Sequence, residues 1–210
     1  MMNMFSECVH KGKRVRLETT RDGLRQATQK RVIAATDRLF SERGFDATTI
    51  RDIAGASDVS VGTVMAVGDK NALLVQVFDA LIEEWHVLRG EPVAEVTGAC
   101  SEQIVGLVKP FVILFTSRQD LARVYASILV SGNSPSTLFT RLASLLVDEI
   151  RSVITRHGCV QHEAAGATAE AIYFAYIGTL FSWSAREVAD EAELSESLRA
   201  TFAAICNCEE

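Results

Sequence analysis

Apolar side chains recur every three or four residues along most of this 210-residue chain, and this spacing is the feature that most restricts its fold. Such spacing places apolar residues on one face of an α-helix, whereas a half-buried strand needs an alternation that no useful length of the sequence has. Only three prolines (Pro92, Pro110 and Pro135) interrupt the pattern. The sequence therefore predicts an all-α fold.

The periodic segments divide into a small N-terminal domain and a larger helical domain. Helices are expected at 28–43, 49–57, 59–67, 69–89, 101–117, 120–130, 136–156, 162–188 and 194–205. Gly90, Pro92 and Gly98 interrupt the pattern after the fourth helix. We expect a basic, flexible arm at 1–24, a compact domain at 25–72, and a regulatory and dimerisation domain at 73–210.

Two short helices with a tight turn between them are expected in the small domain. Gly44 ends the first helix with a residue that suits the left-handed conformation, and Thr48 or Thr49 caps the next helix. That helix ends near residues 57–58, and Ser60 then offers another N-cap. Two short helices joined by a turn of about three to four residues form a helix-turn-helix candidate, so double-stranded DNA is a candidate partner.

The charge distribution permits this partner despite a net charge of −6. Residues 1–70 contain 12 Lys and Arg against 9 Asp and Glu, whereas residues 71–210 contain 9 against 18. Binding to phosphates depends on the local field of the docking face, so an acidic remainder does not exclude DNA. The basic run from Lys11 to Arg31 fits either a solvated tail or an arm that contacts phosphates.

The cysteine pattern and the hydropathy predict a cytoplasmic protein that does not cross a membrane. Five cysteines without a CxxC pair are typical of reduced thiols, and the N-terminus does not resemble a secretory signal. The most apolar stretch, residues 169–185, contains Glu170 and is shorter than the roughly 20 apolar residues of a membrane-spanning helix. Cys206 and Cys208 are expected to be exposed at a frayed C-terminal end.

Residues 29–74 resemble the DNA-binding domain of the tetracycline repressor (TetR) family. The resemblance is carried by LFSERGF at 39–45, TTIRDIA at 48–54, VSVGTV at 59–64, and Lys70 before Leu73 and Leu74. About 46 consecutive residues in this order are a specific signal. The resemblance implies a ligand-responsive regulator, with repression as the default, that binds a palindromic operator as a homodimer.

The resemblance, together with residue size and charge, suggests which side chains meet DNA. Gly62 and Thr63 are small and lie in the first turn of the second short helix, which would let that end approach base edges closely. Thr49 and Lys70 begin the preceding and following helices, where each would contact a phosphate. The complete set of expected DNA-binding residues is Thr48, Thr49, Ser60, Val61, Gly62, Thr63, Met65 and Lys70.

The segment from Met65 to Gly68 departs from the family pattern. The family usually has aromatic residues here, and this chain is one residue shorter, so two expected phosphate anchors are missing. Asp58 also replaces a turn glycine, although Asp tolerates the left-handed conformation. The loss of these two anchors should reduce the slope of log binding constant against log salt concentration by about two units per half-site. The alternative is a TetR-like protein whose operator binding is weakened or lost, and which acts as a ligand-binding or protein-interaction module.

The larger domain is expected to hold an apolar small-molecule effector and the dimer interface. Aromatic residues are candidates for the pocket, although a filled core is the alternative for each: Phe111, Phe115, Tyr125, Phe139, Tyr173, Tyr176 and Trp183. Pro110 should kink or break its helix and create space beside the pocket. The helix expected at 162–188 carries apolar groups on more than one face, which predicts a homodimer through a four-helix bundle formed by residues 162–205.

No enzymatic or metal site is expected. His157, Cys159 and His162 lie close together, but they lack ordinary zinc spacing and fit capping or solvated groups better. Neighbouring carboxylates such as Asp148 and Glu149 point to different helix faces, and no nucleophile, base and orienting group occur together. We therefore expect no cofactor, and a small helical enzyme or metal protein remains the second alternative.

Overall fold

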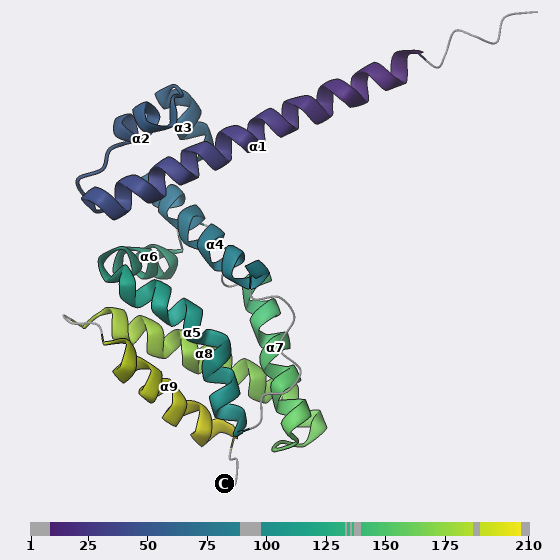
Figure 1. Cartoon of the computed structure of the whole chain (residues 1–210), viewed down its shortest axis with the longest axis vertical. Coiled ribbons are helices and arrows are strands. Elements are labelled where there is room, and N and C mark those ends of the chain that lie inside the picture. Colours follow the sequence, from purple (N-terminus) through teal and green to yellow (C-terminus); the bar gives the residue numbers. More distant parts are fainter. Residues whose placement is uncertain are drawn as a thin grey trace, which may run out of the picture. The chain divides into compact units, whose positions relative to one another are not determined.

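Helices joined by turns and short loops make up the described residues of the computed structural model, which are 9–88, 98–132, 134, 136, 140–186 and 190–206. Its elements are α1 (Val9–Arg43), α2 (Ile50–Ser57), α3 (Val61–Val67), α4 (Lys70–Leu88), α5 (Cys100–Ser117), α6 (Gln119–Ser131), α7 (Arg141–His157), the 3-10 turn η1 (His162–Ala164), α8 (Ala165–Ser184) and α9 (Glu191–Cys206) (Figure 1). This confirms the all-α prediction.

The fold separates into two compact units, Met1–Leu73 and Leu74–Glu210. The division falls in the first turn of α4.

Several helix limits differ from those expected. Helix α1 begins at Val9 and not at Thr28, so part of the segment expected as an arm has helical backbone. Helix α7 begins at Arg141, later than expected, and the last element before α9 is split into η1 and α8. The caps of the short helices agree with the prediction, because Thr49 caps α2 and Ser60 caps α3.

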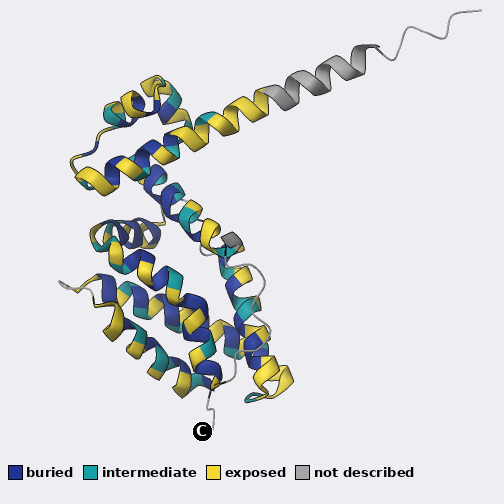
Figure 2. Ribbon diagram, viewed as in Figure 1, coloured by how far each residue is buried: buried dark blue, intermediate teal, exposed yellow. Residues whose placement is uncertain are grey.

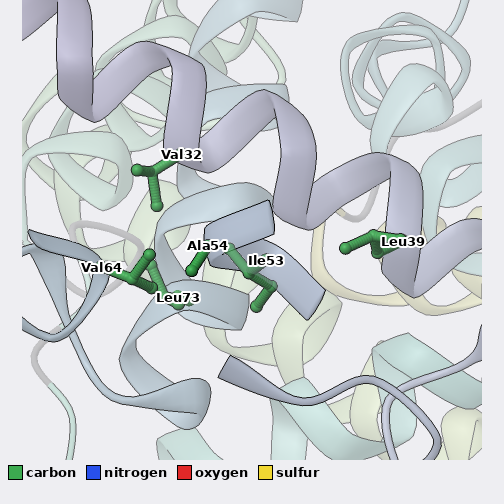
Figure 3. Close-up of a cluster of buried hydrophobic side chains, with 6 residues drawn as sticks. All are labelled: Val32, Leu39, Ile53, Ala54, Val64 and Leu73. Atoms are coloured by element: carbon green, nitrogen blue, oxygen red, sulfur yellow. The ribbon is translucent and has the colours of Figure 1, made fainter. Parts of the chain in front are cut away.

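The first unit is built around a small core to which each of its four helices contributes. Val32 and Leu39 of α1, Ile53 and Ala54 of α2, Val64 of α3 and Leu73 of α4 form one cluster of buried side chains (Figure 3). Val32 and Leu39 are seven residues, or about two turns, apart and so lie on the same face of α1, toward Ile53 and Ala54 of α2. The core therefore fixes α2 and α3 against α1 and leaves their other faces for binding.

The second unit packs its helices around a larger apolar core. Helix α5 packs against α9, α7 packs against α8, and α8 packs against α9. Where α4 and α6 meet, the rings of Phe78 and Tyr125 stack with centroids 4.4 Å apart, and the Tyr125 hydroxyl donates to Asp79 Oδ1 at 3.2 Å. Ser136 donates to the same oxygen at 2.8 Å, so this contact joins two helices and a loop.

Helix α5 continues through Pro110, so the proline does not break the helix, which was one of the two outcomes predicted for it. By length and composition it is also the one helix of the described residues that could cross a membrane, yet 56% of its apolar window is buried within the fold (Figure 2). Burial of this kind is ordinary for a core helix. Phe111 and Phe115, which follow Pro110 and are one turn apart, are both buried in the core.

Candidate nucleic-acid interface and ligand cavity

The turn between α2 and α3 is fixed by backbone geometry. Asp58 adopts the left-handed conformation (φ 52°, ψ 52°), and its N–H donates to the carbonyls of Ala54 and Gly55 at the end of α2. Asp is one of the few residues other than glycine that enter this region at low cost. The replacement of the usual turn glycine by Asp58 therefore leaves the turn intact, as expected from the sequence.

The start of α3 is held by two hydroxyl groups. Ser60 Oγ accepts a hydrogen bond from the Thr63 backbone N–H at 3.1 Å, and its hydroxyl lies 2.9 Å from that of Thr63. A hydroxyl at the N-cap typically contributes about 1 kcal/mol to helix stability. Ser60 is exposed and Thr63 is half-buried, so both remain at the surface while they fix the helix.

The outward face of α3 is small and apolar. Val64 is fully buried, whereas Val61 is 44% exposed and Met65 is 50% exposed. Gly62 and Ala66 are exposed beside them, and α3 carries no charged residue. Apolar side chains in a major groove contact the thymine methyl group, so this face suits readout by methyl contact more than by paired hydrogen bonds.

Thr48 does not face the solvent, which corrects its assignment as a DNA-contacting side chain. It is fully buried, and its hydroxyl donates to the carbonyl oxygens of Gly44 at 2.9 Å and Leu39 at 3.3 Å. The hydroxyl therefore holds the loop between α1 and α2. The sequence did not distinguish it from Thr49, because either hydroxyl suits an N-cap.

Thr49 is exposed, but its hydroxyl is engaged within the protein. It donates to Asp52 Oδ2 at 2.6 Å, and the Thr49 and Asp52 backbone N–H groups complete a capping box. The Thr49 hydroxyl and then its N–H hold the pKa of Asp52 below the ordinary carboxyl value, with a smaller effect from Arg43. The first turn of α2 thus has its own anion, which weakens any phosphate contact there.

Lys70 packs against the loop that follows α1. Its Nζ donates to the Asp46 carbonyl at 3.3 Å and lies 4.3 Å from the centroid of the Phe45 ring. The ammonium group has three protons, so a phosphate contact would share it with these two neighbours. Sequence reasoning identified Lys70 but not its contacts with Phe45 and Asp46, which arise only when the loop folds back on α4.

Helix α1 contributes a basic surface next to α3. Arg21, Arg25, Lys30 and Arg31 are all exposed. A groove beside α3 is lined by Leu24, Arg25, Thr28 and Gln29 of α1 and by Thr63, Ala66 and Val67 of α3. Arg25 thus places a cation of the basic run at the edge of the face expected to meet DNA. Residues 1–8 lie outside the described residues.

The aromatic residues of the second unit surround a cavity of about 20 Å³, room for about one water molecule. Of the predicted pocket residues, Phe111, Phe115, Tyr173 and Tyr176 line it, together with Ile82, His86, Leu142, Leu146, Ile177 and Leu180. Tyr125 and Trp183 are buried elsewhere in the unit, and Phe139 lies outside the described residues. The interior at this site is nearly filled.

The polar groups at this cavity are few. Burial raises the pKa of Tyr173 to about 12 and that of Tyr176 further, so both hydroxyls stay protonated near neutral pH. His86, which sequence reasoning did not identify, lies against the Phe111 ring, and its Nδ1 is 3.7 Å from Glu149 Oε1. These groups could orient a mainly apolar ligand.

The residues first considered for metal binding are not brought together. His157 and His162 are exposed, and the cysteine thiols nearest to Cys159 in space are those of Cys100 and Cys206. Cys206 is fully buried, which corrects its expected exposure, while Cys208 lies outside the described residues. The sequence separates these three cysteines by dozens of residues, so their spacing carried no signal.

Residues 32–67 match the bacterial regulatory proteins of the tetR family. The matched segment covers the end of α1, all of α2 and all of α3. It therefore coincides with the two short helices, the turn that joins them and the part of α1 on which they pack. No curated sequence matches the chain.

Solved structures of similar fold cover most of the chain. A TetR transcriptional regulator from Rhodococcus sp. RHA1 is 14% identical, with a TM-score of 0.60 over 86% of this chain and 95% of that chain. BioQ with its natural double-stranded DNA operator is 19% identical, with a TM-score of 0.57 over 86% and 98%. Thermus thermophilus FadR, a TetR family transcriptional repressor in complex with lauroyl-CoA, is 23% identical, with a TM-score of 0.55 over 83% and 94%. At these identities the likeness establishes the fold alone.

Proposed function

We propose that the chain, whose residues 32–67 match the tetR family, is a transcriptional regulator of that family. We propose further that it represses transcription in the cytoplasm by binding a palindromic operator as a ligand-responsive homodimer. The observation that carries this proposal is the outward face of α3. This face is small and exposed, Ser60 caps the helix, and Val64 on the opposite face is buried in the core of the first unit. The exposed valine, glycine and methionine of α3 form the kind of small apolar surface that can lie close to base edges in a major groove.

Base readout in this proposal rests on apolar contact. Val61 and Met65 meet thymine methyl groups, Gly62 lets the helix approach closely, and the Thr63 hydroxyl reaches a base edge or a phosphate. Removal of one buried methyl group costs about 0.8 kcal/mol, or about fourfold in affinity. The operator half-site should therefore contain thymine at the positions that face α3.

Contacts with the DNA backbone come mainly from α1 and Lys70. Phosphate anchors are missing between Met65 and Gly68, and Asp52 opposes an anion at the start of α2. Arg25 of α1 lines the groove that α3 borders, and Arg21 is exposed one turn before it, so these two arginines supply part of the lost charge. The salt dependence of binding should then fall when basic residues of α1 are neutralised.

Dimerisation through α8 and α9 is supported by an exposed apolar stripe. Phe174 of α8 is 66% exposed, and its exposed neighbours on the same face are mostly small (Ala167, Ala171, Gly178 and Ser182), with Glu170 one turn before it. Their spacing repeats every three or four residues, as at a helix-to-helix interface. Phe174→Glu should give monomers in sedimentation velocity, whereas Val130→Glu, at a position 76% exposed on α6, should not.

The effector site is proposed at the cavity lined by Phe111, Tyr173 and Tyr176. Since the cavity holds about one water molecule, an effector must open it by moving α4, α7 or α8, and such movement is what would change DNA affinity. A preference of about 1–3 kcal/mol for the state that does not bind DNA lowers DNA affinity about 5- to 150-fold. The FadR structure with lauroyl-CoA supports an apolar ligand in this fold.

A gel-shift assay with the DNA upstream of the protein's own gene tests the proposal. The protein should shift a fragment containing an inverted repeat, and Val61→Thr should weaken the shift. The matched control is Val130→Thr, an exposed valine of the second unit, which should bind as the wild type does. A stable dimer that shifts no fragment even at low salt would favour the alternative, a ligand-binding or protein-interaction module without operator binding.

A further inference from the structure

Three cysteines from separate elements meet at one place in the second unit. Cys100 is the first residue of α5, Cys159 lies in the turn after α7, and Cys206 is the last residue of α9. Their Sγ atoms all lie within 4.8 Å of one another, and those of Cys100 and Cys159 are 3.5 Å apart. Cys100 and Cys206 are fully buried, and Cys159 is half-buried.

The separations of the sulfur atoms fit a shared metal ion. With metal–sulfur bonds of about 2.3 Å, three thiolates around one ion lie about 3.8–4.0 Å from one another in tetrahedral or trigonal geometry. The observed distances between sulfur atoms, from 3.5 Å to at most 4.8 Å, lie on either side of this range. Small rotations about the Cα–Cβ bonds would bring the three sulfur atoms to the separations that a shared ion needs. A disulfide would use only two of the three sulfur atoms.

We propose that Cys100, Cys159 and Cys206 form a three-thiolate site for a soft, thiophilic metal ion of the Zn²⁺, Cd²⁺ or Cu⁺ type. Within the described residues no histidine or carboxylate joins the cluster, and sulfur-only ligands select soft ions over Mg²⁺ and Ca²⁺. Loading forms three metal–sulfur bonds and releases three thiol protons to solvent.

The surroundings favour loading at Cys100. This residue begins an 18-residue helix whose N-cap, Ala99, offers no side-chain hydrogen bond. The positive end of the helix stabilises a thiolate in its first turn. The other two ligands come from the ends of different elements, so a bound ion would tie α5, α9 and the turn after α7 together and stabilise the second unit. The inference is independent of DNA binding.

Titration of the reduced protein with Cd²⁺ tests the site. The double variant Cys8→Ser with Cys208→Ser retains only the three cluster cysteines among the five of the chain. It should bind one Cd²⁺ per chain with an ultraviolet thiolate-to-metal absorption band, and it should release about three protons per ion. Zn²⁺ should displace part of the Cd²⁺, raise the midpoint of thermal unfolding and slow alkylation of the thiols, whereas Mg²⁺ should do none of these.

The ligand assignment is tested by adding Cys159→Ser to this background. Cys159 is the least buried of the three, so its replacement disturbs packing least, and circular dichroism checks the fold. The change should lower Cd²⁺ affinity at least about 100-fold, more than the loss of an outer-shell partner. Cys206→Ala provides the second test. Cd²⁺ binding that persists at full strength in both variants, or that is absent from the double variant, would overturn the proposal.

Discussion

Gly62→Ala separates the role of α3 in DNA recognition from its role in the fold. A Cβ atom built at Gly62 meets only Ser60 Oγ, at 3.7 Å, which is an ordinary van der Waals distance. The substitution therefore strains nothing within the protein. Because alanine loses less backbone entropy than glycine in a helix, the free energy of unfolding should stay equal or rise by up to about 1 kcal/mol.

DNA binding should respond in the opposite direction. If the backbone of α3 approaches the bases at Gly62, an added methyl group must displace the helix or a base. The penalty is comparable with one mismatched base pair, about 1–3 kcal/mol per half-site. A homodimer on a palindrome meets the penalty twice, so the affinity should fall about 30-fold or more.

Fluorescence anisotropy with the operator fragment at fixed salt measures the effect, and urea unfolding measures stability. Gly55→Ala is the matched control, because Gly55 is also an exposed helical glycine with open space at its Cβ position, and it borders Arg38 and Glu42 of α1. The control should gain similar stability and keep its DNA affinity. Equal DNA affinities for Gly62→Ala and the wild type would refute the close approach.

Four further results are expected. Replacing thymine by deoxyuridine opposite Val61 or Met65 should weaken binding about fourfold per methyl group in the anisotropy assay, while the same change outside the repeat should have no effect. Lys70→Gln should lower the log-log salt slope of binding by about one unit per half-site if Lys70 contacts a phosphate, and an unchanged slope would limit it to holding Phe45. The lowered pKa of Asp52 adds stability above the unfolded carboxyl pKa of about 3.9, and this contribution is lost as the pH falls through the lower folded value. The difference in the free energy of urea unfolding between the wild type and Asp52→Asn should therefore shrink below about pH 4. Tyr125→Phe removes the bond to Asp79 and should lower the free energy of urea unfolding by about 1–3 kcal/mol, with no change in its denaturant slope.

The helix-turn-helix could be predicted residue by residue because its signals are local. A cap hydroxyl acts on an N–H three residues away, as Ser60 does on Thr63, and a left-handed residue such as Asp58 acts on the preceding turn. The same signals could not separate Thr48 from Thr49. Their different roles depend on which hydroxyl the folded loop turns toward Leu39, nine residues away.

The ligand site could be predicted less well because it depends on packing. Aromatic composition identified Phe111 and Tyr176 as pocket residues. It could not show that the helices pack around them so closely that a cavity of only about 20 Å³ is left. Nor could the sequence show that α5 continues through Pro110, where buried residues on either side pack the helix into the core.

Periodicity and capping by themselves determined that the chain is helical, where its short helices begin, and which helix presents the small residues Gly62 and Thr63. These are short-range interactions that any chain segment carries with it. Tertiary structure alone decided that Thr48 is buried, that Lys70 lies over Phe45, and that cysteines from α5, α9 and the turn after α7 share one place. Such contacts join residues distant in sequence, so they exist only after the apolar faces have packed.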